Sequence, residues 1–196
     1  MLELSAPIEV QSDAHGHDAG APDPFGLGIS AMPPGALVQL AGWENFSEVV
    51  EPMLRALGFS ELGDCKTART AGVSICYRLA RDRILLRSDD AERLAQATRT
   101  LSATEVAVLD LSHARWVLRV EGTRTPDLLA RLAPLDFGPS AFPVGSFAQT
   151  GIDHVGVLVH RQTAERYEVL VPYTWMDSIW NMEEIRLART GVKAAS

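Results

Sequence analysis

Three residue types that form catalytic triads stand close together in the segment DLSHARWVLRVEG: Asp110, Ser112 and His113. A nucleophilic serine needs a histidine placed between it and a carboxylate, each within hydrogen-bonding reach of the next. Neighbouring residues of an extended chain point to opposite faces, so Ser112 and His113 would diverge. Aspartate and serine in a turn instead favour bonds to nearby backbone groups. We therefore predict a structural corner and no catalytic residue, with a surface site at His113 and Arg115 as the alternative.

The remaining potential ligands do not predict a metal or cofactor site. His15, His17 and Asp18 provide few ligands in an irregular segment, which is a weak metal site. His154 and His160 would lie about 20 Å apart in an extended strand, too far to share one ion. The sequence has neither a GxGxxG segment after a strand nor a phosphate loop. We expect this chain to bind no metal and no cofactor.

The composition is that of an ordinary globular protein with an acidic N-terminal part. The 196 residues are 46% hydrophobic and 22% charged, and no apolar run is long enough for a membrane span. The net charge is -7, and no Lys or Arg precedes Arg55. We expect neither nucleic-acid nor membrane partners, because no basic surface is indicated. The N-terminus lacks the features of a targeting peptide, so we expect a cytoplasmic location.

Two halves of similar element order are expected after an N-terminal arm. Residues 1–34 are predicted to be an acidic arm, flexible or bound along a partner, because their composition favours little apolar burial. In residues 35–112 the pattern predicts a strand from Ala36, a helix over 47–57 ended by Gly58, strands over 73–79 and 83–87, a helix capped by Asp89 and Glu92, and a strand over 106–111. This order is β-α-β-β-α-β.

Residues 113–196 repeat the pattern. The expected elements are a strand over 116–121, a helix from Thr125, strands over 146–150, 155–160 and 167–171, and a last helix over 174–188. In the first of these strands, Trp116, Leu118 and Val120 are expected to face the core and Val117 to face away from it. The predicted fold class is α+β, with two ferredoxin-like β-α-β-β-α-β type halves packed together and an extended N-terminal arm.

Four blocks in order, DLSHARWVLRVEG, LLARLAPLDF, AFPVGSFAQTGIDHVGVLVHR and YEVLVP, resemble the folate-binding domain of glycine-cleavage aminomethyltransferases and their relatives. Within that superfamily, residues 36–188 most resemble the gamma subunit of heterotetrameric sarcosine oxidase. The resemblance implies alpha, beta and delta partner subunits that carry FAD, FMN, NAD, zinc and tetrahydrofolate. It also implies a complex that oxidises sarcosine to glycine and passes the one-carbon unit to tetrahydrofolate or releases formaldehyde.

Related iron-sulfur-assembly proteins carry Lys-Gly-Cys where this chain has Val144, Gly145 and Ser146. The resemblance therefore implies a non-catalytic subunit that keeps the fold without the reactive pocket. Alternatives are a gamma-type subunit of an N-methylglutamate or dimethylglycine dehydrogenase or oxidase, and a stand-alone folate-binding protein with a pocket lined by Asp110, His113, Arg115 and Gln149. Arginine and aromatic residues are enriched at interface centres. We accordingly predict a partner interface that includes Arg115, Phe142, Phe147, Gln149 and Trp180.

Overall fold

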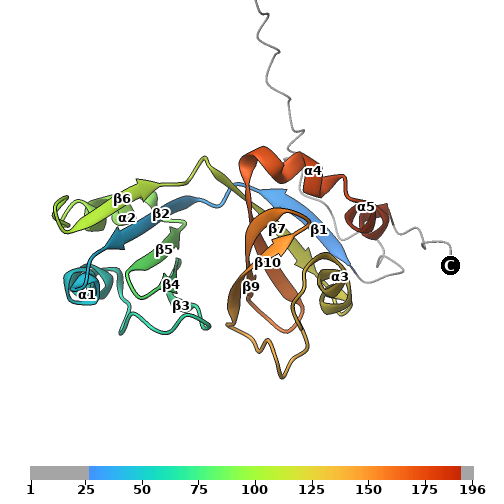
Figure 1. Cartoon of the computed structure of the whole chain (residues 1–196), viewed down its shortest axis with the longest axis horizontal. Coiled ribbons are helices and arrows are strands. Elements are labelled where there is room, and N and C mark those ends of the chain that lie inside the picture. Colours follow the sequence, from blue (N-terminus) through green and yellow to red (C-terminus); the bar gives the residue numbers. More distant parts are fainter. Residues whose placement is uncertain (1–26, 191–196) are drawn as a thin grey trace, which may run out of the picture.

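The computed structural model describes residues 27–190 and shows an α+β fold with two antiparallel sheets of five strands each (Figure 1). The first sheet and its helices come from one continuous stretch of chain. Its elements are β2 (Ala36–Gly42), α1 (Phe46–Leu57), β3 (Arg69–Ala71), β4 (Ser74–Ala80), β5 (Arg83–Ser88), α2 (Ala91–Thr98) and β6 (Val106–Asp110). The strand order is β3-β4-β5-β2-β6. The short strand β3 is the only one of these elements that the sequence pattern did not predict.

The second sheet combines the C-terminal half with a strand from the N-terminal side. Its elements are β1 (Gly28–Met32), β7 (Arg115–Glu121), α3 (Thr125–Leu132), β8 (Phe147–Ile152), β9 (Val155–Arg161), β10 (Arg166–Pro172), the 3-10 helix η1 (Tyr173–Trp175), α4 (Met176–Trp180) and α5 (Glu183–Thr190). The strand order is β1-β7-β10-β9-β8. β1 pairs with β7 from Gly28 opposite Glu121 to Met32 opposite Val117.

The two sheets have the same arrangement of paired strands and differ in the origin of one edge strand. In each sheet the strand next to that edge, β2 or β7, pairs on one side with the last of three consecutive antiparallel strands, β5 or β10. On its other side β2 pairs with β6, which comes later in the same half, whereas β7 pairs with β1. The last strand position of the second half is thus filled from the N-terminal side of the chain. The predicted fold class of two packed, similar halves is confirmed.

The protein has four layers, in which helices cover the outer face of each sheet and the inner faces pack on each other (Figure 1). Buried residues of α1 and α2 pack with the first sheet, and those of α3, α4 and α5 pack with the second. A third cluster consists of strand residues alone and lies between the sheets: Leu37, Tyr77, Leu85, Val117, Phe147, Leu158 and Leu170. This apolar layer holds the two halves together.

Strand β7 is buried on both faces. The sequence analysis placed Val117 on the face away from the core, but Val117 is fully buried in the inter-sheet cluster. Leu118 and Val120 pack on the opposite face with the helices, as predicted. The prediction for Val117 was wrong because the alternation of residues along a strand shows two faces but does not show that a second sheet covers one of them.

The predicted N-terminal arm differs from the structure in its last part. Residues 1–26 of the arm lie outside the described residues. Gly28–Met32 form β1 instead of an arm, and the side chains of Ile29 and Ala31 pack against the second-sheet core. The Gly- and Pro-rich composition of this segment gave no sign of a strand. β1 is defined by its hydrogen bonds to β7, which lies in the other half of the sequence.

Two helix boundaries also differ from the prediction. The N-cap of α2 is Asp90 rather than Asp89, and its carboxylate accepts a hydrogen bond from the Arg93 N–H at 3.0 Å. The single predicted C-terminal helix is divided into η1, α4 and α5. α4 ends at its C-cap residue Asn181, whose backbone N–H and side-chain amide both donate to the Asp177 carbonyl. Among the described residues, no helix is both long and apolar enough to cross a membrane.

Candidate functional site

The predicted corner connects β6 to β7 and is held by side-chain hydrogen bonds. Asp110 Oδ1 accepts bonds from the Ser112 hydroxyl at 2.6 Å and from the Ser112 N–H at 2.9 Å. Both bonds lower the pKa of Asp110, and the bond from the Ser112 hydroxyl has the larger effect. Ser112 Oγ accepts the Leu37 N–H at 3.0 Å, which joins the corner to β2. His113 is exposed and forms no hydrogen bond with residues 27–190, so these three residues do not assemble a triad.

A buried ionic network crosses the boundary between the two sheets, with the carboxylate of Glu168 at its centre. Glu168 lies in β10 and is fully buried. Arg119 of β7 donates to Oε1 from Nε at 3.1 Å and from Nη2 at 2.8 Å. Oε2 accepts a bond from Gln162 Nε2 at 2.7 Å and another from Arg87 Nη1. Both carboxylate oxygens are therefore occupied by donors of this chain, so Glu168 is not free to act as a base.

The Arg87 side chain of this network connects three segments of the chain. Arg87 belongs to β5 of the first sheet, while Glu168 belongs to the second sheet. Besides its ion pair, Arg87 donates from Nε to the carbonyl oxygen of Pro34 at 2.6 Å. Pro34 lies in the crossover between β1 and β2. One guanidinium therefore positions both sheets and the chain segment that passes between them.

A neutral pair lies in the same inter-sheet layer. The Tyr77 hydroxyl and His160 Nδ1 are 3.1 Å apart, and their rings meet edge to face with centroids 5.3 Å apart. Burial raises the pKa of Tyr77 above its ordinary value. Burial lowers the pKa of His160 to about 4. Both groups are uncharged at neutral pH, and each holds the other in place between β4 and β9.

Sequence reasoning missed this layer of polar residues. Its members are Tyr77, Arg87, Arg119, His160, Gln162 and Glu168. One signal was available: charged residues interrupt the apolar strands ILLRS and YEVLV, at Arg87 and Glu168. Charged residues inside apolar strands are rarely buried unless they are paired. The identity of the partner could not be read from the pattern, because the two strands belong to different sheets.

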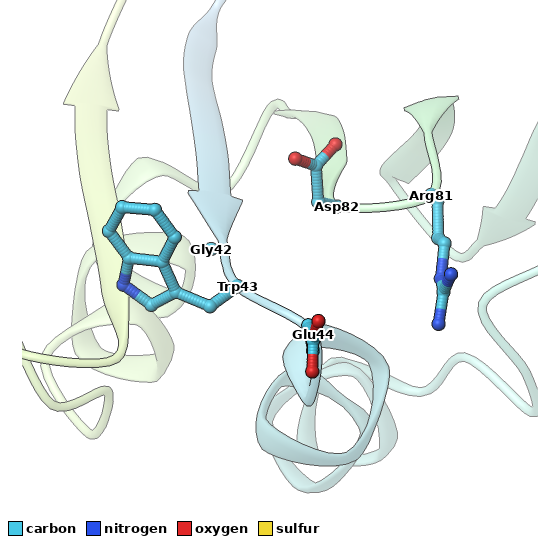
Figure 2. Close-up of a pocket in the computed structure, with 5 residues that line it drawn as sticks. All are labelled: Gly42, Trp43, Glu44, Arg81 and Asp82. Carbon is cyan, nitrogen blue, oxygen red and sulfur yellow. The ribbon is translucent and has the colours of Figure 1, made fainter.

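Two shallow hollows lie on the first half of the molecule. The first has a volume of about 330 Å³ and is lined by Gly42, Trp43, Glu44, Arg81 and Asp82. Figure 2 shows that the side chains of Trp43, Asp82 and Arg81 point in different directions. The second, of about 390 Å³, is lined by Glu48, Val49, Pro52, Met53, Thr100, Leu101, Ser102 and Glu105. The polar side chains of the first hollow diverge, so they do not form the convergent set that a small-molecule site requires (Figure 2).

A metal site is not formed by the part of the chain that the structure describes. Within residues 27–190, no group of three or more His, Cys, Asp or Glu side chains is arranged to hold an ion. His154 lies in the turn before β9 and is exposed, whereas His160 is buried, so the two do not share a site. The potential ligands His15, His17 and Asp18 lie outside the described residues.

The predicted partner interface is divided between the core and the surface. Phe142 is 4% exposed and Phe147 is 3% exposed, so the prediction that they face a partner does not hold for these two rings. Trp180 is half-buried, with the guanidinium carbon of Arg189 3.7 Å from its ring centroid. Gln149 is exposed and donates to the Leu79 carbonyl at 3.3 Å.

Arg115 is the predicted interface residue with an unused charge. It is half-buried, and its side chain forms no hydrogen bond or ion pair with residues 27–190. Burial lowers the pKa of its guanidinium. Trp116, the next residue, lies on the opposite face of β7 and contacts Tyr173, with ring centroids 6.2 Å apart.

The structure thus defines a scaffold of two packed, similar α+β halves that a buried ion pair joins, and solved structures of other proteins have the same scaffold. The sequence matches no family model and no curated protein. The structure is similar to a chain of heterotetrameric sarcosine oxidase from Corynebacterium sp. U-96, solved in complex with pyrrole 2-carboxylate. The TM-score is 0.72 and the identity 20%, over 87% of this chain and 87% of that chain.

A second similar structure is the glycine cleavage system aminomethyltransferase T from Bartonella henselae. The TM-score is 0.57 and the identity 15%, over 87% of this chain and 48% of that chain. The aligned part thus spans about half the length of the aminomethyltransferase. At the level of the fold, these two similarities confirm the resemblance inferred from the sequence.

Proposed function

We propose that this chain is a non-catalytic gamma-type subunit of a heterotetrameric flavoprotein sarcosine oxidase. The observation that carries the proposal is the reciprocal coverage: the match with the chain of the oxidase complex extends over 87% of both chains. The match with the aminomethyltransferase covers only 48% of that protein. A chain whose length and fold both correspond to a chain of a heterotetramer is best explained as a component of such an assembly.

The chemistry of the described residues supports a structural role in that assembly. The buried carboxylate of Glu168 is neutralised by Arg87 and Arg119, and the buried Tyr77–His160 pair is uncharged. The exposed carboxylate of Asp110 is engaged by Ser112. In this proposal the chain contributes binding surface, and the alpha, beta and delta partner subunits carry FAD, FMN, NAD, zinc and tetrahydrofolate. The complex would act in the cytoplasm on sarcosine, with glycine as the product.

The test is co-purification of the full chain from its native cells. An affinity-tagged chain should recover stoichiometric partner chains, visible flavin absorbance and sarcosine-dependent flavin reduction. The same preparation should be offered N-methylglutamate and dimethylglycine, because a related dehydrogenase or oxidase would reduce its flavin with one of these instead. Recovery of the tagged chain alone, in good yield and without flavin, would contradict the subunit role.

The stand-alone folate-binding alternative is favoured by the similarity to the aminomethyltransferase. Two of its candidate residues have hydrogen-bond partners within the chain, because Asp110 accepts from Ser112 and Gln149 donates to the Leu79 carbonyl, while His113 is exposed. Calorimetric titration of the purified chain with tetrahydrofolate distinguishes the two proposals. We expect no saturable heat, whereas saturable micromolar binding would favour the folate-binding protein.

A further inference from the structure

The edge strand β6 carries apolar side chains in an exposed position. It pairs with β2 on one side only and forms one edge of the first sheet. Val108 is 47% exposed and Leu109 52% exposed, on opposite faces of the strand. Trp43, at the end of the neighbouring strand β2, is 72% exposed (Figure 2). Natural proteins usually protect such edges with charged residues, proline or a covering segment, and within residues 27–190 none of these protects the apolar centre of β6.

The backbone of β6 also offers hydrogen-bonding groups to a partner. The Leu111 N–H donates to the Leu37 carbonyl at 2.7 Å, immediately beyond the paired part of the strand. Hydrogen-bonded pairs alternate along an antiparallel ladder, so the bonds to β2 come from Leu109 and Ala107. The N–H and C=O groups of Val108 consequently point away from β2, as do those of Asp110. An extended segment can bond to these groups without displacing any existing strand.

The charges around β6 specify the kind of segment that fits. Glu105 precedes the strand and Asp110 ends it, while residues 100–114 contain no lysine or arginine. Glu48 adds a third carboxylate, because it lines the second hollow together with Glu105. A second copy of β6 paired antiparallel about Val108 would bring Asp110 of one copy near Glu105 of the other, which is unfavourable. The edge therefore favours a cationic partner over self-association.

We propose that β6 is the docking strand for a partner chain, which adds an extended segment with apolar residues at its centre and Lys or Arg at its ends. The backbone bonds to Val108 and Asp110 would provide the pairing, the side chains of Val108 and Leu109 the apolar contact, and Glu105 the orientation. This inference rests on the proposed role as a subunit, and it names the element through which the subunit joins its neighbour.

The test uses the full chain and a synthetic probe, an alternating valine-threonine peptide with two lysines at each end. Amide hydrogen exchange followed by NMR should show new protection at the Val108 and Asp110 amides when the peptide is added. A peptide of the same sequence with glutamates in place of the lysines should bind at least tenfold more weakly. The free chain should show no protection at the Val108 amide.

Matched variants distinguish specific binding at β6 from non-specific binding of the peptide to apolar surface. Val108→Lys should weaken binding of the lysine peptide at least tenfold, whereas Val144→Lys, at a valine 55% exposed outside the strands, should not. Val108→Pro should abolish the protection of Asp110 without removing a bond inside the chain, because the Val108 N–H points outward.

Four results would overturn the proposal. They are equal binding of the two peptides, protection confined to β3, equal effects of the two lysine variants, and a dimer already protected at Val108. The peptide result reports on β6 alone, so co-purification of partners remains a separate test of the subunit role.

Discussion

At the scale of single residues, the polar groups that matter most lie between the sheets rather than in a cleft. Glu168, Arg87, Tyr77 and His160 are all buried there, and each has a partner from another strand. Buried polar groups stabilise a unique packing when every one is satisfied and are costly when one partner is removed. Single substitutions in this layer should therefore have large effects on stability.

The stability of the fold should fall as the pH is lowered from 6.5 towards 4. Burial lowers the pKa of His160 from 6.5 to about 4, so between these values the unfolded chain binds a proton that the folded chain excludes. This group alone should reduce the free energy of unfolding by about 2 kcal/mol at pH 5 relative to pH 7.5. Urea unfolding at the two pH values measures the difference.

A histidine variant provides the control for that measurement. His160→Gln should remove about 2 kcal/mol of the pH dependence, because the titrating group is gone. An unaltered pH dependence in His160→Gln would show that this imidazole is not the group responsible.

Neutralising Glu168 should destabilise the protein strongly. Glu168→Gln leaves the guanidiniums of Arg87 and Arg119 between the sheets without a counter-charge, at an expected cost of about 3–5 kcal/mol in urea unfolding. The matched control is Glu121→Gln, which breaks the ion pair with Arg166 at the surface and should cost less than about 1 kcal/mol. Similar losses in the two variants would contradict a special role for the buried network.

At the scale of elements, substitutions in β1 test whether this strand contributes to the stability of the second sheet. Ile29 points towards the second-sheet core, while Ser30 is exposed on the other face. Ile29→Asp should lower the free energy of unfolding by about 2 kcal/mol, because it places a charge against apolar residues. Ser30→Asp should change it by no more than about 0.5 kcal/mol. Equal, small effects would indicate that β1 does not belong to the folded unit.

Elements with local signals were predictable, and elements that depend on distant partners were not. The helix of residues 47–57 ends at Gly58, which adopts the left-handed conformation expected of a C-cap. The strands predicted over 146–150 and 155–160 are present as β8 (Phe147–Ile152) and β9 (Val155–Arg161). β3 and β1 were missed because short strands carry little local signal, and pairing with β4 and β7 alone defines them.

At the scale of the whole molecule, the inter-sheet cluster should make the two halves unfold together. Its members come from both sheets, and each half alone would expose this apolar face to water. Leu170→Ala, at a residue 1% exposed, should lower the free energy of unfolding by about 2–5 kcal/mol while preserving one transition. Calorimetry should give equal calorimetric and van 't Hoff enthalpies. Two separate transitions in the wild-type chain would contradict this coupling.

The sequence by itself determined the two α+β halves, most of the strands and helices, and the corner at Asp110 and Ser112. These features depend on local periodicity, caps and turns, which neighbouring residues encode. Only the tertiary structure decided that the halves pack sheet to sheet, that Phe142 and Phe147 are buried, and that Glu168 is paired across that boundary. Such contacts join residues far apart in the chain, and local patterns show which groups need a partner without showing which partner they find.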